Sequence, residues 1–198
     1  MDGKTMDRRG LLRAGAAFGA FGLSGASAEP ALPAYDVPEA HMPSVVRLTE
    51  PWAPYEIHVD PDRFNLYWTL PDRLAIRYTV GIGRPGLYEP GIFHVGAKKE
   101  WPAWTPTPDM IARQPDLYAR WEDGMPGGID NPLGARALYL FTPEHGDTFL
   151  RIHGTDDPGT IGRQVSNGCA RLVNDQMIDL YERVPLDTRV LLYSKVGV

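Results

Sequence analysis

Short runs in which apolar and polar residues alternate constrain the fold of this chain more than any other feature of its sequence. The run Leu74–Val80 alternates throughout, and the runs Glu56–Val59 and Asn65–Leu70 alternate wholly or in part. A period of two places the apolar side chains on one face of a β-strand. Because Pro71-Asp72-Arg73 is typical of a turn, we expect hairpins packed as one sheet.

Further strands are expected at residues 92–96, 137–141, 148–152 and 188–193. Near the C-terminus, Asn174 is a candidate N-cap, and Met177, Leu180, Tyr181 and Val184 follow with the spacing of one helix face. The 19 prolines and 21 glycines favour turns over long helices. We therefore expect a mainly β fold, a sandwich-like or barrel-like packing of short strands, with one amphipathic helix.

The chain divides into three parts. Residues 1–28 carry Arg8-Arg9, a weakly apolar run and a small-residue cleavage site, Ala26-Ser27-Ala28, which together resemble a twin-arginine signal peptide. Residues 29–54 are rich in proline and lack a sustained period, so we expect a linker. Residues 55–198 form the one predicted domain. No apolar run approaches the roughly 20 residues that a spanning helix needs, so an exported, periplasmic protein without a transmembrane span is expected.

Export gives the single cysteine of the chain a particular meaning. Cys169 cannot form an internal disulfide, and an unpaired thiol in an oxidising compartment indicates reactivity. The alternative is an inert buried cysteine, but Asn167, Gly168 and Arg171 nearby are poor neighbours for an apolar core. The formal net charge of −5 argues against binding to nucleic acid.

Residues 97–136 form a long irregular stretch, with one helical turn expected at residues 109–113. Such a loop inside a compact domain is often a lid or a binding wall. A structural cover over one end of the sheet is the alternative, and the two do not exclude each other.

His153 ends a predicted strand, and Cys169 lies in a glycine-containing turn before the helix. A thiol needs a base to act as a nucleophile at neutral pH, and a histidine commonly supplies it. The backbone amides of Asn167, Gly168 and Cys169 could hold the oxygen of a tetrahedral intermediate. This set predicts acyl transfer through a thioester on Cys169, with His153 as the proton acceptor. No metal or cofactor is expected.

The chain resembles the L,D-transpeptidase catalytic domain (YkuD-like) family over roughly residues 55–194. The resemblance rests on His153-Gly154-Thr155, on Ser166-x-Gly168-Cys169-x-Arg171-Leu172 and on Asn174-x-x-x-x-Asp179-Leu180-Tyr181. Upstream, Pro90–Phe93, the Trp101–Pro108 segment and Asn131–Arg136 match as well.

The resemblance implies an enzyme of bacterial peptidoglycan that forms a thioester with a tetrapeptide stem and releases the terminal D-alanine. The acyl group then passes to an amine, such as that of diaminopimelate on a neighbouring stem or of a wall-attached protein. Many members carry a second histidine where this chain has Asn167, which leaves His153 as the only nearby base.

Three residues are candidates for substrate binding: Arg171, Gly154 and Arg136. The guanidinium of Arg171 could hold a stem carboxylate, or it could tie the turn to the helix, and Arg136 has the same two interpretations. Rival functions are a cysteine hydrolase on the same scaffold and a non-catalytic wall-binding module. We expect a monomer.

Overall fold

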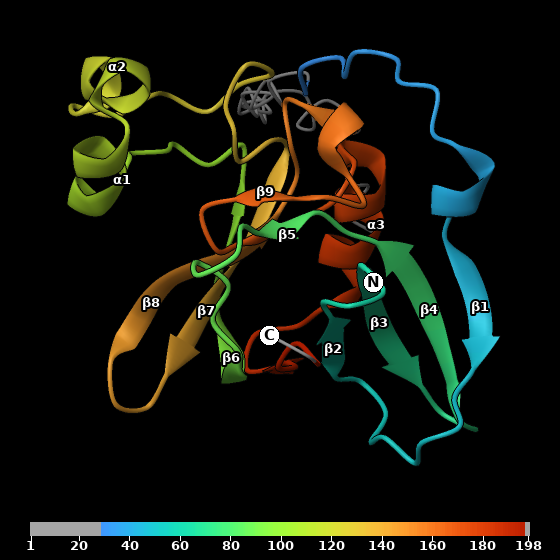
Figure 1. Cartoon of the computed structure of the whole chain (residues 1–198). Helices are drawn as coiled ribbons and strands as arrows, with labels where there is room; N and C mark the ends of the chain where they lie inside the picture. The colour runs from blue at the N-terminus through green and yellow to red at the C-terminus, as the bar shows by residue number, and fades with distance from the viewer. Residues whose placement is uncertain (1–28, 197–198) are drawn as a thin grey trace, which may run out of the picture.

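The computed structural model describes residues 29–196, and its main feature is a nine-stranded mixed sheet (Figure 1). The strand order is β1-β4-β3-β2-β11-β6-β7-β8-β10, and β5 and β9 pair separately. The strands are β1 (Ser44–Arg47), β2 (Ile57–Asp60), β3 (Asn65–Leu70), β4 (Leu74–Thr79), β5 (Ile82–Gly83), β6 (Gly91–Glu100), β7 (Arg136–Thr142), β8 (Gly146–His153), β9 (Gln164–Ser166), β10 (Ala170–Arg171) and β11 (Arg189–Leu192). The signal peptide predicted at residues 1–28 lies outside the described residues.

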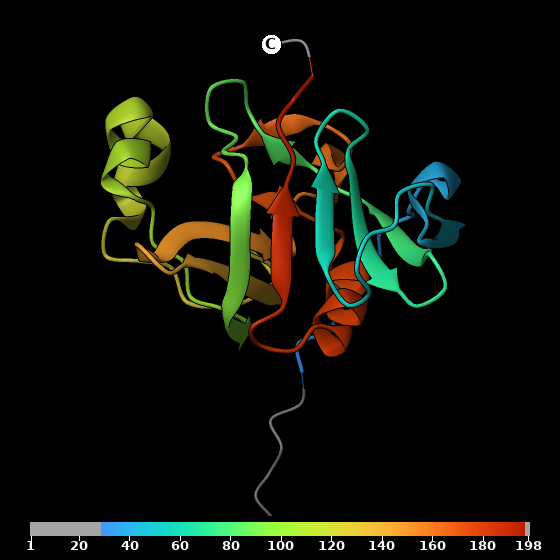
Figure 2. The ribbon, with the colours of Figure 1, turned by 90° about the horizontal axis from the view of Figure 1, so that it is seen from below.

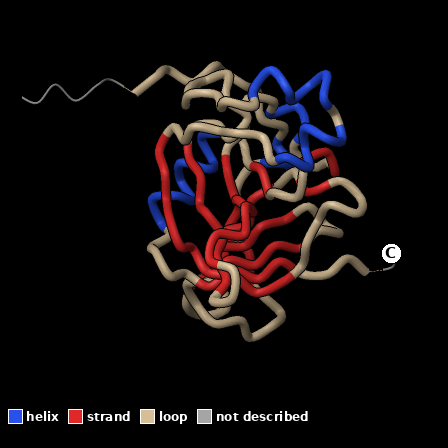
Figure 3. Tube along the Cα trace, turned by 90° about the vertical axis from the view of Figure 1, so that its left-hand side faces the viewer, coloured by secondary structure: helices blue, strands red, loops and turns tan. Residues whose placement is uncertain are grey.

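The sheet curves until its last strand, β10, is joined by a β-bridge to the residues that follow β4, the neighbour of the edge strand β1. The amide of Gly81, just after β4, donates to the carbonyl of Arg171 at 2.9 Å, and the amide of Arg171 donates back at 2.8 Å. Figure 2 shows β7 and β8 running crosswise to β6 and β11, and Figure 3 shows the strands wrapping around one interior. The expected mainly β, barrel-like packing is confirmed.

The core lies inside this curved sheet and is closed by α3 (Asn174–Arg183). Met177 and Leu180 of α3 are fully buried, together with Leu138 of β7 and Ile152 of β8. Fully burying one such side chain stabilises the fold by about 1.5–3 kcal/mol. The apolar stripe predicted for this helix is therefore core.

One detail of the helix prediction is wrong. Asn174 is the first residue of α3 rather than its N-cap, which is Val173 and provides no side-chain hydrogen bond. The side-chain oxygen of Asn174 instead accepts from the amides of Ala135 and Thr155, at 3.0 and 3.1 Å. Its amide group donates to the carbonyl of Thr155 at 2.9 Å. Asn174 thus ties the loop after β8 to the start of β7.

The segment predicted to be a linker differs from that expectation, because it supplies the edge strand β1. Ser44–Arg47 pairs antiparallel with β4, and Val45 remains 65% exposed at the sheet edge. A strand of four residues among prolines is too short to produce a clear alternation. The short 3₁₀ helix η1 (Glu39–His41) precedes β1.

The long irregular stretch is partly regular. β6 runs on to Glu100, and two short helices follow, α1 (Pro108–Arg113) and α2 (Pro115–Tyr118), so the expected turn at 109–113 is confirmed. Thr107 caps α1 by accepting from the amide of Met110 at 3.3 Å. These helices stand at one edge of the molecule (Figure 1), and we call residues 108–118 the cover. The remaining 3₁₀ helices are η2 (Ala119–Trp121) and η3 (Pro158–Thr160).

Candidate active site

The pairing of β8 with β10 brings the segment that contains His153 beside the segment that follows Cys169. The strands run parallel, with Ala170 opposite Ile152 and Arg171 opposite His153. Since neighbouring strands share their pleat, the side chains of His153 and Arg171 project from the same face, while Ile152 and Ala170 are buried on the other. Cys169 directly precedes β10, so it lies beside the end of β8 that carries His153.

His153 is buried, with only 4% of its surface exposed. Its Nδ1 lies 2.6 Å from the carbonyl oxygen of Gly154. A carbonyl can only accept, so Nδ1 carries the proton of the neutral ring, and Nε2 has the free lone pair. Burial, helped by the positive charge of Arg171, lowers the pKa of His153 to about 3. At neutral pH the ring is therefore an uncharged base.

Cys169 is partly exposed, and its Sγ lies 4.0 Å from the carbonyl oxygen of Phe149. Burial of the sulfur raises the pKa of the thiol, although the Arg151 amide and the charges of Arg151 and Arg171 act in the opposite direction. The resting pair is thus a thiol and a neutral imidazole.

The turn before Cys169 is held by Ser166. The Oγ of Ser166 donates to the carbonyl of Cys169 at 2.7 Å and accepts from the amide of Gly168 at 3.3 Å. Gly168 has a φ of +123°, and a Cβ there would lie 2.9 Å from the carbonyl oxygen of Leu87. Only glycine fits this position without a shift of the backbone.

These contacts reduce the number of backbone amides that can serve the predicted oxyanion site. The amide of Gly168 is already used by Ser166. Within residues 29–196, the amides of Asn167 and Cys169 donate no hydrogen bond to the protein. Two of the three predicted amides are therefore available to a substrate oxygen, and the third belongs to the turn.

The side chain of Asn167 has a function that its sequence position did not indicate. Its Oδ1 accepts from Arg84 at 2.9 Å and from Arg113 at 3.3 Å. Its Nδ2 donates to the hydroxyl of Tyr118 at 2.9 Å. Arg113 and Tyr118 belong to the cover, so Asn167 joins the cover to the nucleophile turn.

The side chain of Arg171 points away from solvent and is held within the fold. Its Nη2 donates to Thr160 Oγ1 at 2.9 Å, while its Nε has no partner among the described residues. Burial lowers the pKa of Arg171, but nearby Asp157 and Asp156 act in the opposite direction. This contact holds Arg171 to the 3₁₀ helix η3 and not to α3, the helix that follows the motif. A contact with substrate and a tie between the turn and α3 both stay predictions for Arg171.

Contacts within the protein account for the other two candidate substrate-binding residues, Gly154 and Arg136. A Cβ on Gly154 would lie 2.0 Å from Oδ1 of Asn174, so the residue must be glycine for steric reasons. The guanidinium of Arg136 is paired with Glu29 at 2.6 Å and with Glu100 at 3.7 Å. The structure does not bring the Arg136 side chain together with His153 and Cys169.

Sequence reasoning missed Arg84, Arg113 and Tyr118 as neighbours of the motif. These residues lie 83, 54 and 49 positions from Asn167. No local spacing relates them to the motif. Arg113 and Tyr118 lie in the long stretch 97–136, which was predicted to be a wall or a cover, whereas Arg84 lies outside it and carried no signal.

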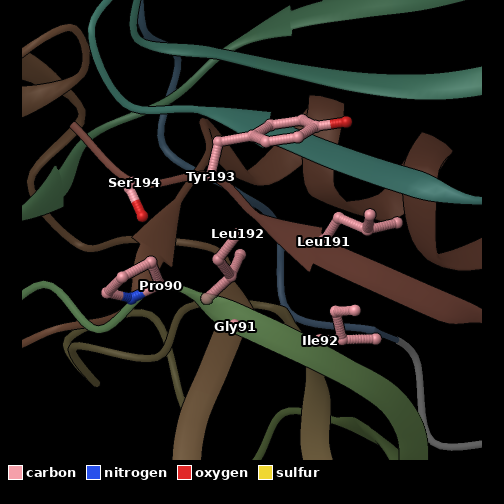
Figure 4. A pocket seen from close by; sticks show the side chains of 7 residues that line it. All are labelled: Pro90, Gly91, Ile92, Leu191, Leu192, Tyr193 and Ser194. Atoms are coloured by element: carbon pink, nitrogen blue, oxygen red, sulfur yellow. The ribbon is translucent and has the colours of Figure 1, made fainter. Parts of the chain in front are cut away.

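A surface hollow lies away from the predicted site. It has a volume of about 360 Å³ and is formed by the adjoining ends of β6 and β11, as Figure 4 shows. None of its lining residues belongs to the predicted site. Its lining consists of Pro90, Gly91, Ile92, Leu191, Leu192, Tyr193 and Ser194.

In residues 29–196, no cluster of three or more His, Cys, Asp or Glu side chains is arranged to hold a metal ion. In the same range, no helix has the length and apolar character needed to cross a bilayer.

Comparison with known proteins identifies the family. Residues 54–192 match the family model described as the L,D-transpeptidase catalytic domain. The Escherichia coli protein named "Probable L,D-transpeptidase ErfK/SrfK" is 35% identical over 142 residues, which are 70% of this chain and 44% of that protein. A Fuscovulum blasticum relative is 44% identical over 100 residues, 50% of this chain and 48% of its own. The chain thus spans less than half the length of these curated relatives.

Solved structures agree on the fold. A Brucella melitensis structure named "probable carnitine operon oxidoreductase caia" is 43% identical, has a TM-score of 0.53, and is matched over 79% of this chain and 92% of its own. That name concerns the Brucella protein alone. L,D-transpeptidase 3 from Mycobacterium tuberculosis is 14% identical, with a TM-score of 0.52 over 70% of this chain and 60% of its own. At that identity the likeness concerns the fold only. The family-model match spans most of the chain, and on this basis the protein belongs to the L,D-transpeptidase catalytic domain family.

Proposed function

We propose that this protein is an exported, periplasmic L,D-transpeptidase of peptidoglycan that uses Cys169 as its nucleophile and His153 as its base. The donor is a tetrapeptide stem, and the acceptor is an amine such as that of diaminopimelate or of a wall-attached protein. The observation that carries this proposal is the register of β8 with β10, which sets His153 beside Arg171, two residues after Cys169.

In the first half of the reaction, the thiol proton moves to Nε2 of His153 while the sulfur attacks the carbonyl carbon of the scissile bond. The resulting oxyanion accepts hydrogen bonds from the amides of Asn167 and Cys169. When the intermediate collapses, the C–N bond breaks and the imidazolium gives its proton to the departing D-alanine amine. A thioester on Cys169 remains.

In the second half, the acceptor amine attacks the thioester carbon and loses a proton to His153. Collapse expels the sulfur, which recovers that proton as a thiol, and a new amide bond links donor to acceptor. The atoms and charges balance without an external reagent.

The charge of Arg171 favours transfer of the proton from His153 to the leaving amine. An imidazolium on His153 would lie in a buried site beside a fixed guanidinium, which disfavours the charged ring. The proton acquired from the thiol is therefore held weakly and passes readily to the leaving amine. This effect assigns Arg171 a role in proton transfer without requiring contact with a substrate.

The test is incubation of the purified protein with tetrapeptide-containing muropeptides, followed by mass analysis. Cross-linked dimers are the expected product, and Cys169→Ala should abolish them without changing the circular dichroism spectrum. Shortened monomers alone would instead identify the hydrolase.

A carbapenem provides the check against a non-catalytic wall-binding module. An activated Cys169 should form a covalent adduct that is absent from Cys169→Ala. A folded protein that forms neither adduct nor product would refute the proposed enzyme.

A further inference from the structure

Two guanidinium groups converge on one neutral oxygen beside the nucleophile. Arg84 reaches Oδ1 of Asn167 from the turn after β5, and Arg113 reaches the same atom from the end of α1, at 2.9 and 3.3 Å. The second acceptor of Arg84, Oε1 of Gln114 at 3.1 Å, is also neutral. A carboxylate would be a stronger acceptor for both groups, because it adds the attraction between opposite charges and can accept two guanidinium hydrogen bonds side by side.

No carboxylate among the described residues pairs with Arg84 or Arg113. Arg84 and Arg113 take part in no ion pair within 4.0 Å in residues 29–196, and the buried Nε of Arg84 has no hydrogen-bond partner there. Arg136 and Arg151, by contrast, are paired with Glu29 and Asp147. The two guanidinium groups beside Asn167 thus have no carboxylate within ion-pair distance among residues 29–196, although the chain has a formal net charge of −5.

The position of the pair relates it to the reaction. The backbone amide of Arg84 donates to the carbonyl of Ser166 at 3.0 Å, which fixes Arg84 to the nucleophile turn. Tyr118 holds the amide group of Asn167 from the other side, so that its oxygen faces the two arginines. Asn167 is only two residues from Cys169. A peptide bound at the thiol would therefore lie near this point.

We propose that Arg84 and Arg113 form a carboxylate-binding subsite for the donor stem peptide, with Oδ1 of Asn167 occupying the anion position in the free protein. This inference rests on the proposed transpeptidase function. The shared chemistry is a free carboxylate near the scissile bond. Its two sources are the terminal D-alanine and the side-chain end of diaminopimelate.

The experiment compares three donors: the free tetrapeptide, its C-terminal amide, and the tetrapeptide amidated at the diaminopimelate carboxylate. Arg113→Gln is the chosen variant, because Arg113 is exposed on a short helix and its loss leaves the core unchanged. The KM for the free donor should rise about tenfold, the effect of losing one hydrogen bond between charged groups. Arg113→Lys should recover part of the loss, since it retains the charge.

Combining the Arg113→Gln change with donor amidation identifies which carboxylate binds, because two changes that remove the same contact do not add. For the donor that lacks the bound carboxylate, wild-type protein should already show the raised KM, and Arg113→Gln should raise it no further. For the other amidated donor, the variant should have its full effect. Arg120→Gln is the matched control, because Arg120 lies just after the cover, stacked on Trp121, and makes no contact with Asn167.

Two results would overturn the inference. If Arg113→Gln raised KM equally for all three donors, the pair would only dock the cover. If it changed KM for none, the pair would not touch the donor. In either case, turnover by wild-type protein and carbapenem labelling of Cys169 would leave the proposed function intact, whereas absence of both would refute that function instead.

Discussion

Asn174 connects three parts of the site, and its replacement by alanine tests how the base is positioned. The side chain makes three hydrogen bonds: to the amide of Ala135 and to both the amide and the carbonyl of Thr155, at 3.0, 3.1 and 2.9 Å. A hydrogen bond of this kind stabilises a protein by about 1 kcal/mol net. Asn174→Ala should therefore lower the free energy of unfolding by about 3 kcal/mol, a large part of the 5–15 kcal/mol typical of a domain.

The same change should reduce activity, because the residue after His153 packs directly against Oδ1 of Asn174. Loss of that contact frees Gly154, whose carbonyl fixes the imidazole tautomer. Urea titration measures the stability, and the initial rate of muropeptide transfer measures the activity.

The control for this experiment is Asp175→Ala at the next position. Asp175 is exposed in the first turn of α3, so its loss removes only a favourable interaction with the helix dipole, about 0.3–1 kcal/mol. If Asn174→Ala cost no more than this control, the three hydrogen bonds would not hold the loop. If the rate were also unchanged, the claim that Asn174 positions His153 would be wrong.

Two further predictions concern pH and the turn. The pKa of His153 is about 3 in the folded protein and about 6.5 when exposed, so the unfolded chain binds more protons between these values, and stability should fall as pH is lowered through this range. His153→Ala should flatten that fall by up to about 1.4 kcal/mol per pH unit in urea titrations; identical slopes would contradict the lowered pKa. Gly168→Ala should cost about 1–3 kcal/mol and most of the transfer activity, because its backbone is strained for any side chain and its Cβ would approach the carbonyl of Leu87. Gly128→Ala, which faces open space, should change neither property.

Much of the sheet could be predicted because its strands carry local signals. Alternation over Leu74–Val80 identified β4, and the helical spacing of Met177 and Leu180 identified α3. Where the local signal was weak, the prediction failed. Asparagine is a residue type that favours the N-cap position. The side chain of Asn174 instead accepts hydrogen bonds from two backbone amides in distant loops, those of Ala135 and Thr155.

The arrangement of the site depends on contacts between residues that lie far apart in the sequence, which motif spacing does not predict. The bridge from Gly81 to Arg171 joins residues far apart in the chain, and it gives β10 a partner on the side away from β8. Likewise, nothing near Arg84 indicates that it meets Asn167. Both contacts arise from closure of the sheet, which is a property of the whole fold.

Asn167 shows why the motif and the cover have to be considered together. Its backbone amide is one of the two that remain free for an oxyanion, while its side chain is held by Arg84, Arg113 and Tyr118. A shift of the cover is therefore transmitted to the amide through a single residue. A histidine in its place has two ring nitrogens, and a neutral ring offers one donor and one acceptor at fixed positions. It could not accept two guanidinium hydrogen bonds at one atom and also donate to Tyr118 with the present geometry. Asparagine at this position thus removes a second imidazole from the site and, by the same substitution, provides the contact that fixes the cover beside Cys169.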